Sequence, residues 1–316
     1  MKFGTIDEGD VTRVVLIEND RGVLLSGLPG RSDPTDVLDL IVRPLTEGQL
    51  ATARSRAGLE LASLRWRPPI LRTPKNIFCV GVNYREHLGE SVPVRTSDSP
   101  SLGPCWFTKP HTSLAAHREP LIIAQDQTSI DYEGEVAAVI GRRCSRVSVE
   151  AALGAVFGYT ILNDVSNRDL QRDREEWFYG KAADGYAPCG PWIVTADEIG
   201  DPQRLQLETR INDKVRQRAS TQLMIHSFAE LIADLSAAIT LEPGDIIAGG
   251  TPAGVGMATG SYLRAGDHVV IEVAGIGELH TPVVAAVEPG RSMVSSGGLK
   301  ALTAPRKSIG REGGSL

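Results

Sequence analysis

The sequence predicts a mainly β protein with helices, an α+β fold, in which a small N-terminal α/β domain precedes a larger domain. Three observations predict it. From residue 76 onward, short apolar runs alternate with Gly, Pro and Asp; helical patterns interrupt them only twice; and residues 1–72 combine a hairpin pattern with two helical patterns. The chain has 316 residues, with 33 Gly and 19 Pro, which suits a turn-rich globular fold.

The N-terminal domain is predicted to span residues 1–72. Two alternating runs, "VTRVVLIEND" and "RGVLLSGL", flank the turn signal Asn19 to Gly22 and predict a hairpin. Two segments that open on capping residues, "DPTDVLDLIV" and "TEGQLATARSRAGL", predict helices. The Pro-rich passage "RWRPPILRTP" cannot continue a helix, so a boundary is expected near residue 72.

The larger domain is predicted to span residues 73–287. Its expected strands are "NIFCVGVN", "CWFTK", "EVAAVIG", "VFGYTILNDVS", "PWIVT", "LQLETRIN", "DIIAGGTP" and "HVVIEVAGIGEL". Its expected helices are "SVEAALGAV" and "HSFAELIADLSAAI". Residues 288–316 are rich in Ser and Gly without periodicity, which predicts a mobile tail.

Composition and charge exclude several classes of partner. The net charge of −6, with scattered basic residues, argues against nucleic acid binding. No window reaches the ~18 apolar residues of a membrane-spanning helix, and the N-terminus has no leader pattern, so a cytoplasmic location is expected. The four cysteines lie far apart and form no CxxC pair, which argues against a disulfide framework and a zinc site.

Three carboxylates form the first candidate site. Glu133 and Glu135 are two positions apart in "DYEGEVAAVIG", so a strand would place them on one face. Asp164 follows the strand of "YTILNDVSNRD". An all-oxygen set suits hard cations such as Mg²⁺, Mn²⁺ or Ca²⁺. Taken singly, the two Glu also fit a solvent-facing strand edge, and Asp164 also fits a helix N-cap.

The segment "NYREHLGE" holds a second candidate, His87 with Glu90. Residues at i and i+3 share one face of a short helix, and a carboxylate beside an imidazole orients it and raises its basicity. A surface histidine beside an incidental charge is the alternative.

A lysine and a glycine-rich turn complete the candidates. Lys181 lies in the apolar segment "WFYGKAADGYAPCGPWIV", where it is either desolvated and aimed at an anion or a lysine with an exposed tip on a loop. The turn "GGTPAGVG" carries Thr251 and lets backbone amides approach a small anion, although a tight β-turn needs the same residues. Neither a Gly-x-Ser-x-Gly elbow nor a Gly-x-Gly-x-x-Gly fingerprint supports acyl-enzyme chemistry or dinucleotide binding.

Five segments between residues 73 and 287 together resemble, in order, the signatures of the fumarylacetoacetate hydrolase family: "DYEGEVAAVIG", "GYTILNDVSNRDLQ", "GKAADGYAPCGPWIV", "TLEPGDIIAGGTPAGVG" and "LRAGDHVVIEVAGIGEL". The resemblance implies a β-roll with a mixed sheet, a divalent metal, usually Mg²⁺ or Mn²⁺, and a homodimer. It implies site roles residue by residue: metal ligands Glu133, Glu135 and Asp164; an active-site lysine, Lys181; a water-activating pair, His87 and Glu90; and substrate contacts Arg168, Gln171 and Thr251. The chain departs from the family pattern at Gly185 and Gly250, where family members commonly carry Thr.

The implied reaction is hydrolysis of a C–C bond in a 2,4-dioxo acid, an acylpyruvate or a fumarylpyruvate-like compound, through a metal-stabilised enolate. The same site without water attack would decarboxylate an oxaloacetate-like acid or isomerise a 2-hydroxy-dienoate. Hydrolysis is favoured because both members of the water-activating pair are present. A non-catalytic module that binds a small acid is the alternative outside enzymes; such a module would have lost carboxylates or the lysine, which this sequence keeps.

Overall fold

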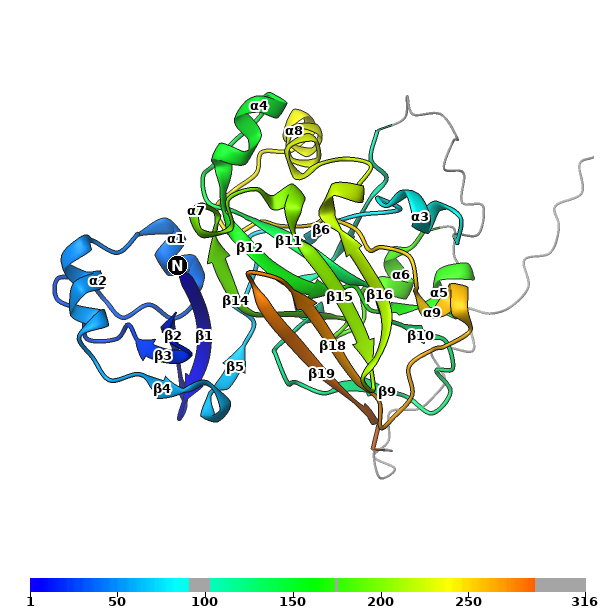
Figure 1. Ribbon diagram of the computed structural model, residues 1–316, viewed down its shortest axis with the longest axis horizontal. Coiled ribbons are helices and arrows are strands. Elements are labelled where there is room, and N and C mark those ends of the chain that lie inside the picture. Colours follow the sequence, from blue (N-terminus) through cyan, green and yellow to red (C-terminus); the bar gives the residue numbers. More distant parts are fainter. Residues whose placement is uncertain (91–102, 174–175, 288–316) are drawn as a thin grey trace, which may run out of the picture. The chain divides into compact units, whose positions relative to one another are not determined.

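Short strands form most of the fold, as the sequence predicts (Figure 1). The computed structural model describes residues 1–90, 103–173 and 176–287. The strands are β1 (Lys2–Glu8), β2 (Val11–Glu18), β3 (Arg21–Leu24), β4 (Leu59–Glu60), β5 (Arg65–Arg67), β6 (Ile77–Val80), β7 (Trp106–Lys109), β8 (Leu114–Ala115), β9 (Leu121–Ile123), β10 (Ile130–Asp131), β11 (Gly134–Ile140), β12 (Val156–Asn163), β13 (Ser166–Asn167), β14 (Ala187–Thr195), β15 (Gln206–Ile211), β16 (Lys214–Ser220), β17 (Ile246–Ala248), β18 (His268–Val273) and β19 (Gly277–Ala285). The helices are α1 (Val37–Val42), α2 (Glu47–Arg54), α3 (Arg85–Leu88), α4 (Val149–Ala152), α5 (Arg168–Arg172), α6 (Phe178–Lys181), α7 (Ala196–Ile199), α8 (Phe228–Ala238) and α9 (Gly256–Thr259).

The N-terminal segment forms the expected hairpin and helices. Strands β2 and β3 pair in antiparallel register around Asn19 and Asp20, which both adopt the left-handed conformation that a two-residue hairpin turn requires. Asp36 caps α1, and Thr46 begins α2 with a capping box. Strand β1, which the sequence analysis does not anticipate, pairs with β2 and also with β14. Residues 1–285 form one compact unit, and the domain boundary near residue 72 stays a prediction.

The larger sheet holds the strands that carry the candidate site. Among the described residues its order is β4-β3-β2-β1-β14-β12-β11-β17-β6-β7, with β5 beside β1 and β8 beside β14. The sheet is mixed, since β17 and β6 run parallel whereas β11 is antiparallel to both neighbours. Every residue of β11 is buried, as its continuous apolar run predicts. Packing on both faces therefore fixes this strand.

A second sheet has the order β16-β15-β18-β19-β9 in the described part of the chain (Figure 1). Along β18, Val269, Ile271 and Val273 are buried, and the residues between them are more exposed. This alternation is typical of an antiparallel sheet with one face on the core and one face in water. The mainly β fold with helices is thus confirmed.

No helix in the described ranges is long and apolar enough to cross a membrane. The predicted mobile tail, residues 288–316, lies outside the described residues.

Candidate active site

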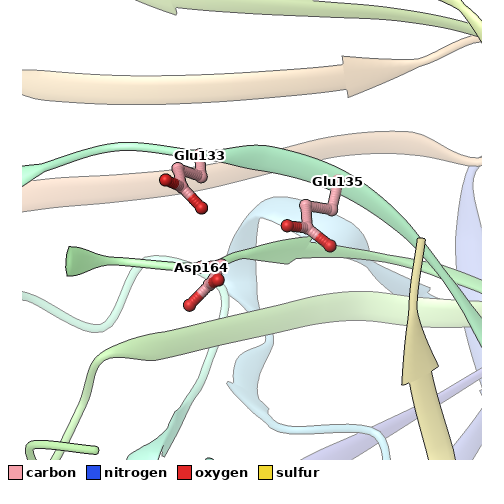
Figure 2. Close-up of side chains that lie close together, drawn as sticks. All are labelled: Glu133, Glu135 and Asp164. Atoms are coloured by element: carbon pink, nitrogen blue, oxygen red, sulfur yellow. The ribbon is translucent and has the colours of Figure 1, made fainter. Parts of the chain in front are cut away.

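Three carboxylates from two neighbouring strands converge at the centre of the site. Glu133 directly precedes β11, Glu135 lies within it, and Asp164 directly follows β12. Because β11 and β12 are antiparallel with Gly134 opposite Asn163, the ends that carry these acids lie side by side. Figure 2 shows the carboxyl groups facing a common space, and one oxygen of each lies within 4.8 Å of the others.

Burial rules out the solvent-facing edge that the glutamate spacing also allowed. The exposed fractions of Glu133, Glu135 and Asp164 are 5%, 1% and 0%. Nor does Asp164 cap the following helix, because the N-cap of α5 is Asn167. Three buried acids at this separation repel one another and need cations nearby.

Two buried lysines supply part of that compensation. Lys181, at the end of α6, donates from Nζ to Glu133 Oε2 at 2.7 Å and to Asp164 Oδ2 at 2.6 Å. Lys109, at the end of β7, donates to Asp164 Oδ1 at 2.6 Å. Burial on its own lowers the pKa of Lys181, but Asp164 and Glu133 raise it above its ordinary value. Lys181 is thus a buried ammonium paired with acids, not a lysine whose tip reaches solvent.

Arg168, the first residue of α5, is the third cation. Its guanidinium donates to Glu133 Oε1, from Nε to Asp131 Oδ2 at 2.8 Å, and from Nη1 to Gln171 Oε1 at 2.9 Å. Arg168 and Gln171 therefore contact each other beside the carboxylates. Their predicted role as substrate contacts stays a prediction.

The pKa values of the two glutamates diverge. Burial on its own would raise the pKa of Glu133, but Lys181 and Arg168 bring it well below its usual range. Burial, and then the charges of Asp164 and Glu133, raise the pKa of Glu135 well above its usual range, even though the Gly250 amide donates to Glu135 Oε2 at 2.8 Å. The site therefore has more negative charge than its own cations neutralise.

The donor set fits a divalent cation. The three acids offer only oxygen atoms, which hard cations prefer, and an added positive charge would offset both the burial and the repulsion that raise the pKa of Glu135. A buried acidic triad of this kind fits a divalent metal site.

The short helix α3 brings His87 and Glu90 together beside this centre. His87 Nδ1 lies 3.1 Å from Glu90 Oε2, and His87 is buried. Both oxygens of Glu90 accept from the Gly254 amide at 3.0 Å. A proton on His87 would also lower the pKa of Glu133, so the imidazole lies near the carboxylates. The carboxylate in this pair is held from a second direction, as an orienting group should be.

The glycine-rich turn approaches the site through its backbone. Gly250 has a φ of 88°, and a Cβ there would lie 2.7 Å from the Asn83 Cβ, so a side chain at this position is strained and crowded. Asn83 itself donates to the Gly249 carbonyl at 2.8 Å. Thr251 Oγ1 donates to the Gly134 carbonyl at 3.0 Å and accepts from Gln217 at 2.8 Å. Substrate binding by Thr251 stays a prediction.

The other departure from the family pattern, Gly185, also has a positive φ, 76°. A Cβ there would meet nothing within 4 Å, so the backbone conformation, not lack of space, favours glycine.

Lys109 and Asp131 belong to the site, although the sequence analysis does not single them out. Asp131 is fully buried, and besides Arg168 it accepts from the Gly256 amide at 2.6 Å and the Met257 amide at 2.9 Å, at the start of α9. The available signals were a lysine at the end of the apolar run "CWFTK" and a third acid in "DYEGE". Neither signal identifies the residue's partner, because the partner is distant in the sequence. Asp164, the partner of Lys109, lies 55 residues further along the chain.

Comparison with known proteins gives the class. Residues 76–284 match the family model described as fumarylacetoacetate (FAA) hydrolase, C-terminal. The chain therefore belongs to the fumarylacetoacetate hydrolase family, and the predicted fold of that family is confirmed.

Three similar proteins illustrate the range of reactions in this family. The chain is 42% identical over 226 residues to oxaloacetate tautomerase YisK of Bacillus subtilis, covering 71% of this chain and 74% of that protein. It resembles the structure of 5-carboxymethyl-2-hydroxymuconate delta-isomerase from Mycobacterium smegmatis, with TM-score 0.71, 34% identity and coverage of 91% and 100%. It also resembles maleylpyruvate hydrolase from Sphingobium sp. SYK-6 in complex with manganese(II) ion and pyruvate, with TM-score 0.74, 30% identity and coverage of 91% and 100%.

Proposed function

We propose that this protein is a divalent-metal-dependent hydrolase that cleaves a C–C bond in a 2,4-dioxo acid, such as an acylpyruvate or a fumarylpyruvate-like compound. The observation that carries the proposal is the His87–Glu90 pair, held by the Gly254 amide beside a buried carboxylate triad. A base for water next to a site for a chelating acid is what this hydrolysis requires.

We propose Mg²⁺ or Mn²⁺ as the cation, held by Glu133, Glu135 and Asp164. When bound, it would supply Lewis-acid stabilisation of negative charge on the oxygens of a 2-oxo acid. The manganese and pyruvate in the Sphingobium hydrolase structure support both the ion and the class of ligand.

His87 is assigned the proton transfers. With Nδ1–H donated to Glu90, Nε2 keeps a lone pair and takes a proton from water, whose oxygen attacks the C4 carbonyl carbon of the substrate. The C3–C4 bond then breaks, and its electron pair stays with the C1–C3 fragment as an enolate. The fragment from C4 leaves as a carboxylic acid, and a proton delivered to C3 completes the 2-oxo acid product. One water is consumed.

Lys181 is assigned an electrostatic role. Its ammonium has three N–H groups, two of which donate to Glu133 and Asp164. Because it is fully enclosed, its positive charge acts on nearby negative charge without screening by water. One well-placed donor of this kind contributes about 3 to 4 kcal/mol to a transition state.

The test is His87→Ala, assayed with acylpyruvates in Mg²⁺ and in Mn²⁺. We expect turnover to fall by at least about 100-fold, as for loss of a general base, while Mn²⁺ affinity measured by calorimetry stays unchanged. His111→Ala, outside the site, is the matched control. Undiminished turnover in His87→Ala would remove the water-activating role.

A second candidate is keto–enol tautomerisation, isomerisation or decarboxylation of an oxaloacetate-like or 2-hydroxy-dienoic acid. The identity of 42% to an oxaloacetate tautomerase favours it. In the tautomerase version His87 would move a proton to or from C3, with no water attack and no C–C cleavage. One experiment separates the tautomerase from the hydrolase by following the absorbance of the oxaloacetate enol together with the release of pyruvate. Loss of the enol absorbance without pyruvate release, and no turnover of acylpyruvates, would favour the tautomerase.

We also propose a homodimer, as the family resemblance implies. Light scattering during size-exclusion chromatography checks the dimer. We expect a mass of twice the 33.9 kDa of the chain.

A further inference from the structure

Outside the carboxylate centre, three of the chain's six histidines, His117, His268 and His280, gather at the second sheet, where His268 and His280 lie on the more exposed face of β18 and β19. His268 begins β18 and His280 lies in β19. Because Val270 is opposite His280 in the antiparallel register, the two histidines are diagonal neighbours on one face. His280 Nδ1 and His268 Nε2 are 3.2 Å apart, at an exposed position that an ion can reach.

This separation matches two ligands on one metal ion. Zn–N bonds of 2.0 to 2.1 Å at a tetrahedral angle place the two nitrogens about 3.3 Å apart. Without an ion, one nitrogen must carry a proton and donate to the other. With an ion, both lone pairs are used.

A carboxylate orients His280 for this role. Glu278 Oε2 lies 2.9 Å from His280 Nε2, and Glu278 Oε1 accepts from Arg210 at 2.8 Å. When Nε2–H donates to Glu278, Nδ1 keeps its lone pair toward His268. Metal-ligating histidines regularly donate their second ring nitrogen to a carboxylate in this way.

The third histidine, His117, positions the pair. His117 Nδ1 accepts from the His280 amide at 3.2 Å, and its ring packs edge-on against that of His280.

We propose that His268 and His280 form a second metal site, selective for late-transition divalent ions such as Zn²⁺, Ni²⁺ or Cu²⁺, with Glu278 as a positioning residue and water completing the coordination. Imidazole nitrogens prefer these ions, whereas the buried carboxylates prefer Mg²⁺ or Mn²⁺. The two sites thus select different cations. A bound ion would tie β18 to β19.

The test is a calorimetric titration of Ni²⁺ into untagged protein. The protein solution contains Mg²⁺ in large excess, which occupies the carboxylate centre. We expect the wild type and the control His111→Ala to bind one Ni²⁺ per chain. We expect His268→Ala and His280→Ala to bind Ni²⁺ at least about tenfold more weakly. Mg²⁺-dependent turnover should be the same in all four proteins. Equal Ni²⁺ affinity in the wild type and both cluster variants would overturn the site.

Two further variants guard against a folding artefact. His268→Gln keeps a polar side chain at the same exposed position, and we expect it to weaken Ni²⁺ binding as His268→Ala does. Glu278→Gln leaves both ligands in place and should weaken Ni²⁺ binding by about tenfold through loss of the orienting charge. Unchanged affinity in His268→Gln would contradict the ligand assignment; unchanged affinity in Glu278→Gln would remove the positioning role.

Discussion

The carboxylate centre and the His87–Glu90 pair are neighbours, but they are held in different ways. Glu133, Glu135 and Asp164 come from the antiparallel strands β11 and β12 and are fixed by Lys109, Lys181 and Arg168. In the His87–Glu90 pair, His87 comes from the four-residue helix α3, Glu90 lies just beyond that helix, and Glu90 accepts from the Gly254 amide. Metal binding should therefore be separable from proton transfer by mutation.

The largest effect is expected from Glu133→Gln. The substitution removes a charge from the proposed metal site and the partner of Lys181 and Arg168, so metal-dependent turnover should fall on the order of 10³-fold or more. Calorimetry with Mn²⁺ checks the cause. Normal Mn²⁺ affinity in this variant would mean that the metal assignment is wrong.

Lys109→Met should lower the free energy of unfolding by about 3 to 5 kcal/mol, because it leaves the fully buried Asp164 short of one partner. Added Mn²⁺ should recover part of this loss, since an ion beside Asp164 replaces the missing charge. The matched control is Lys75→Met, which breaks a pair with the buried Asp245 away from the carboxylates. If Mn²⁺ rescues both variants equally, Lys109 has no special relation to the metal centre.

The sequence predicts those parts of the fold and of the site that depend on interactions between residues close together in the chain. The strands, the β2–β3 hairpin and the capped helices follow from local patterns. The triad could be inferred because Glu133 and Glu135 are two positions apart at the start of one strand and Asp164 directly follows another. The roles of Lys109 and Asp131 could not be inferred from the sequence, because they depend on partners that only the sheet order brings together. Strand β1 was missed although it pairs with the neighbouring β2, because its short run "KFGTIDE" holds only two large apolar residues, Phe3 and Ile6.

A smaller effect is expected from Glu90→Gln. The amide oxygen can still accept from Gly254, so α3 should stay in place, but the negative charge that orients the His87 imidazole is lost. We expect turnover to fall by about 10- to 100-fold with unchanged Mn²⁺ affinity. A fall in Mn²⁺ affinity equal to that in Glu133→Gln would show that the two parts of the site are not separable.

The smallest effect concerns pH. Because the pKa of Glu135 is raised, this carboxyl is the one that gains a proton first as the pH falls, and a divalent ion must displace that proton. Mn²⁺ affinity should therefore rise with pH and level off above the pKa of Glu135. Calorimetry in buffers of different ionisation enthalpy measures the proton released on binding; a release that persists in Glu135→Gln would assign the proton elsewhere.

The most direct test of the proposed metal site is thermal unfolding with Mn²⁺ and oxalate, a stable mimic of the chelating end of a 2-oxo acid. A ligand that binds only the folded state must raise the midpoint. We expect Mn²⁺ with oxalate to raise the unfolding midpoint of the wild type and of His87→Ala, and to leave the midpoint of Glu133→Gln unchanged. No shift in the wild type with Mn²⁺ or Mg²⁺, or an equal shift in Glu133→Gln, would contradict the proposed site.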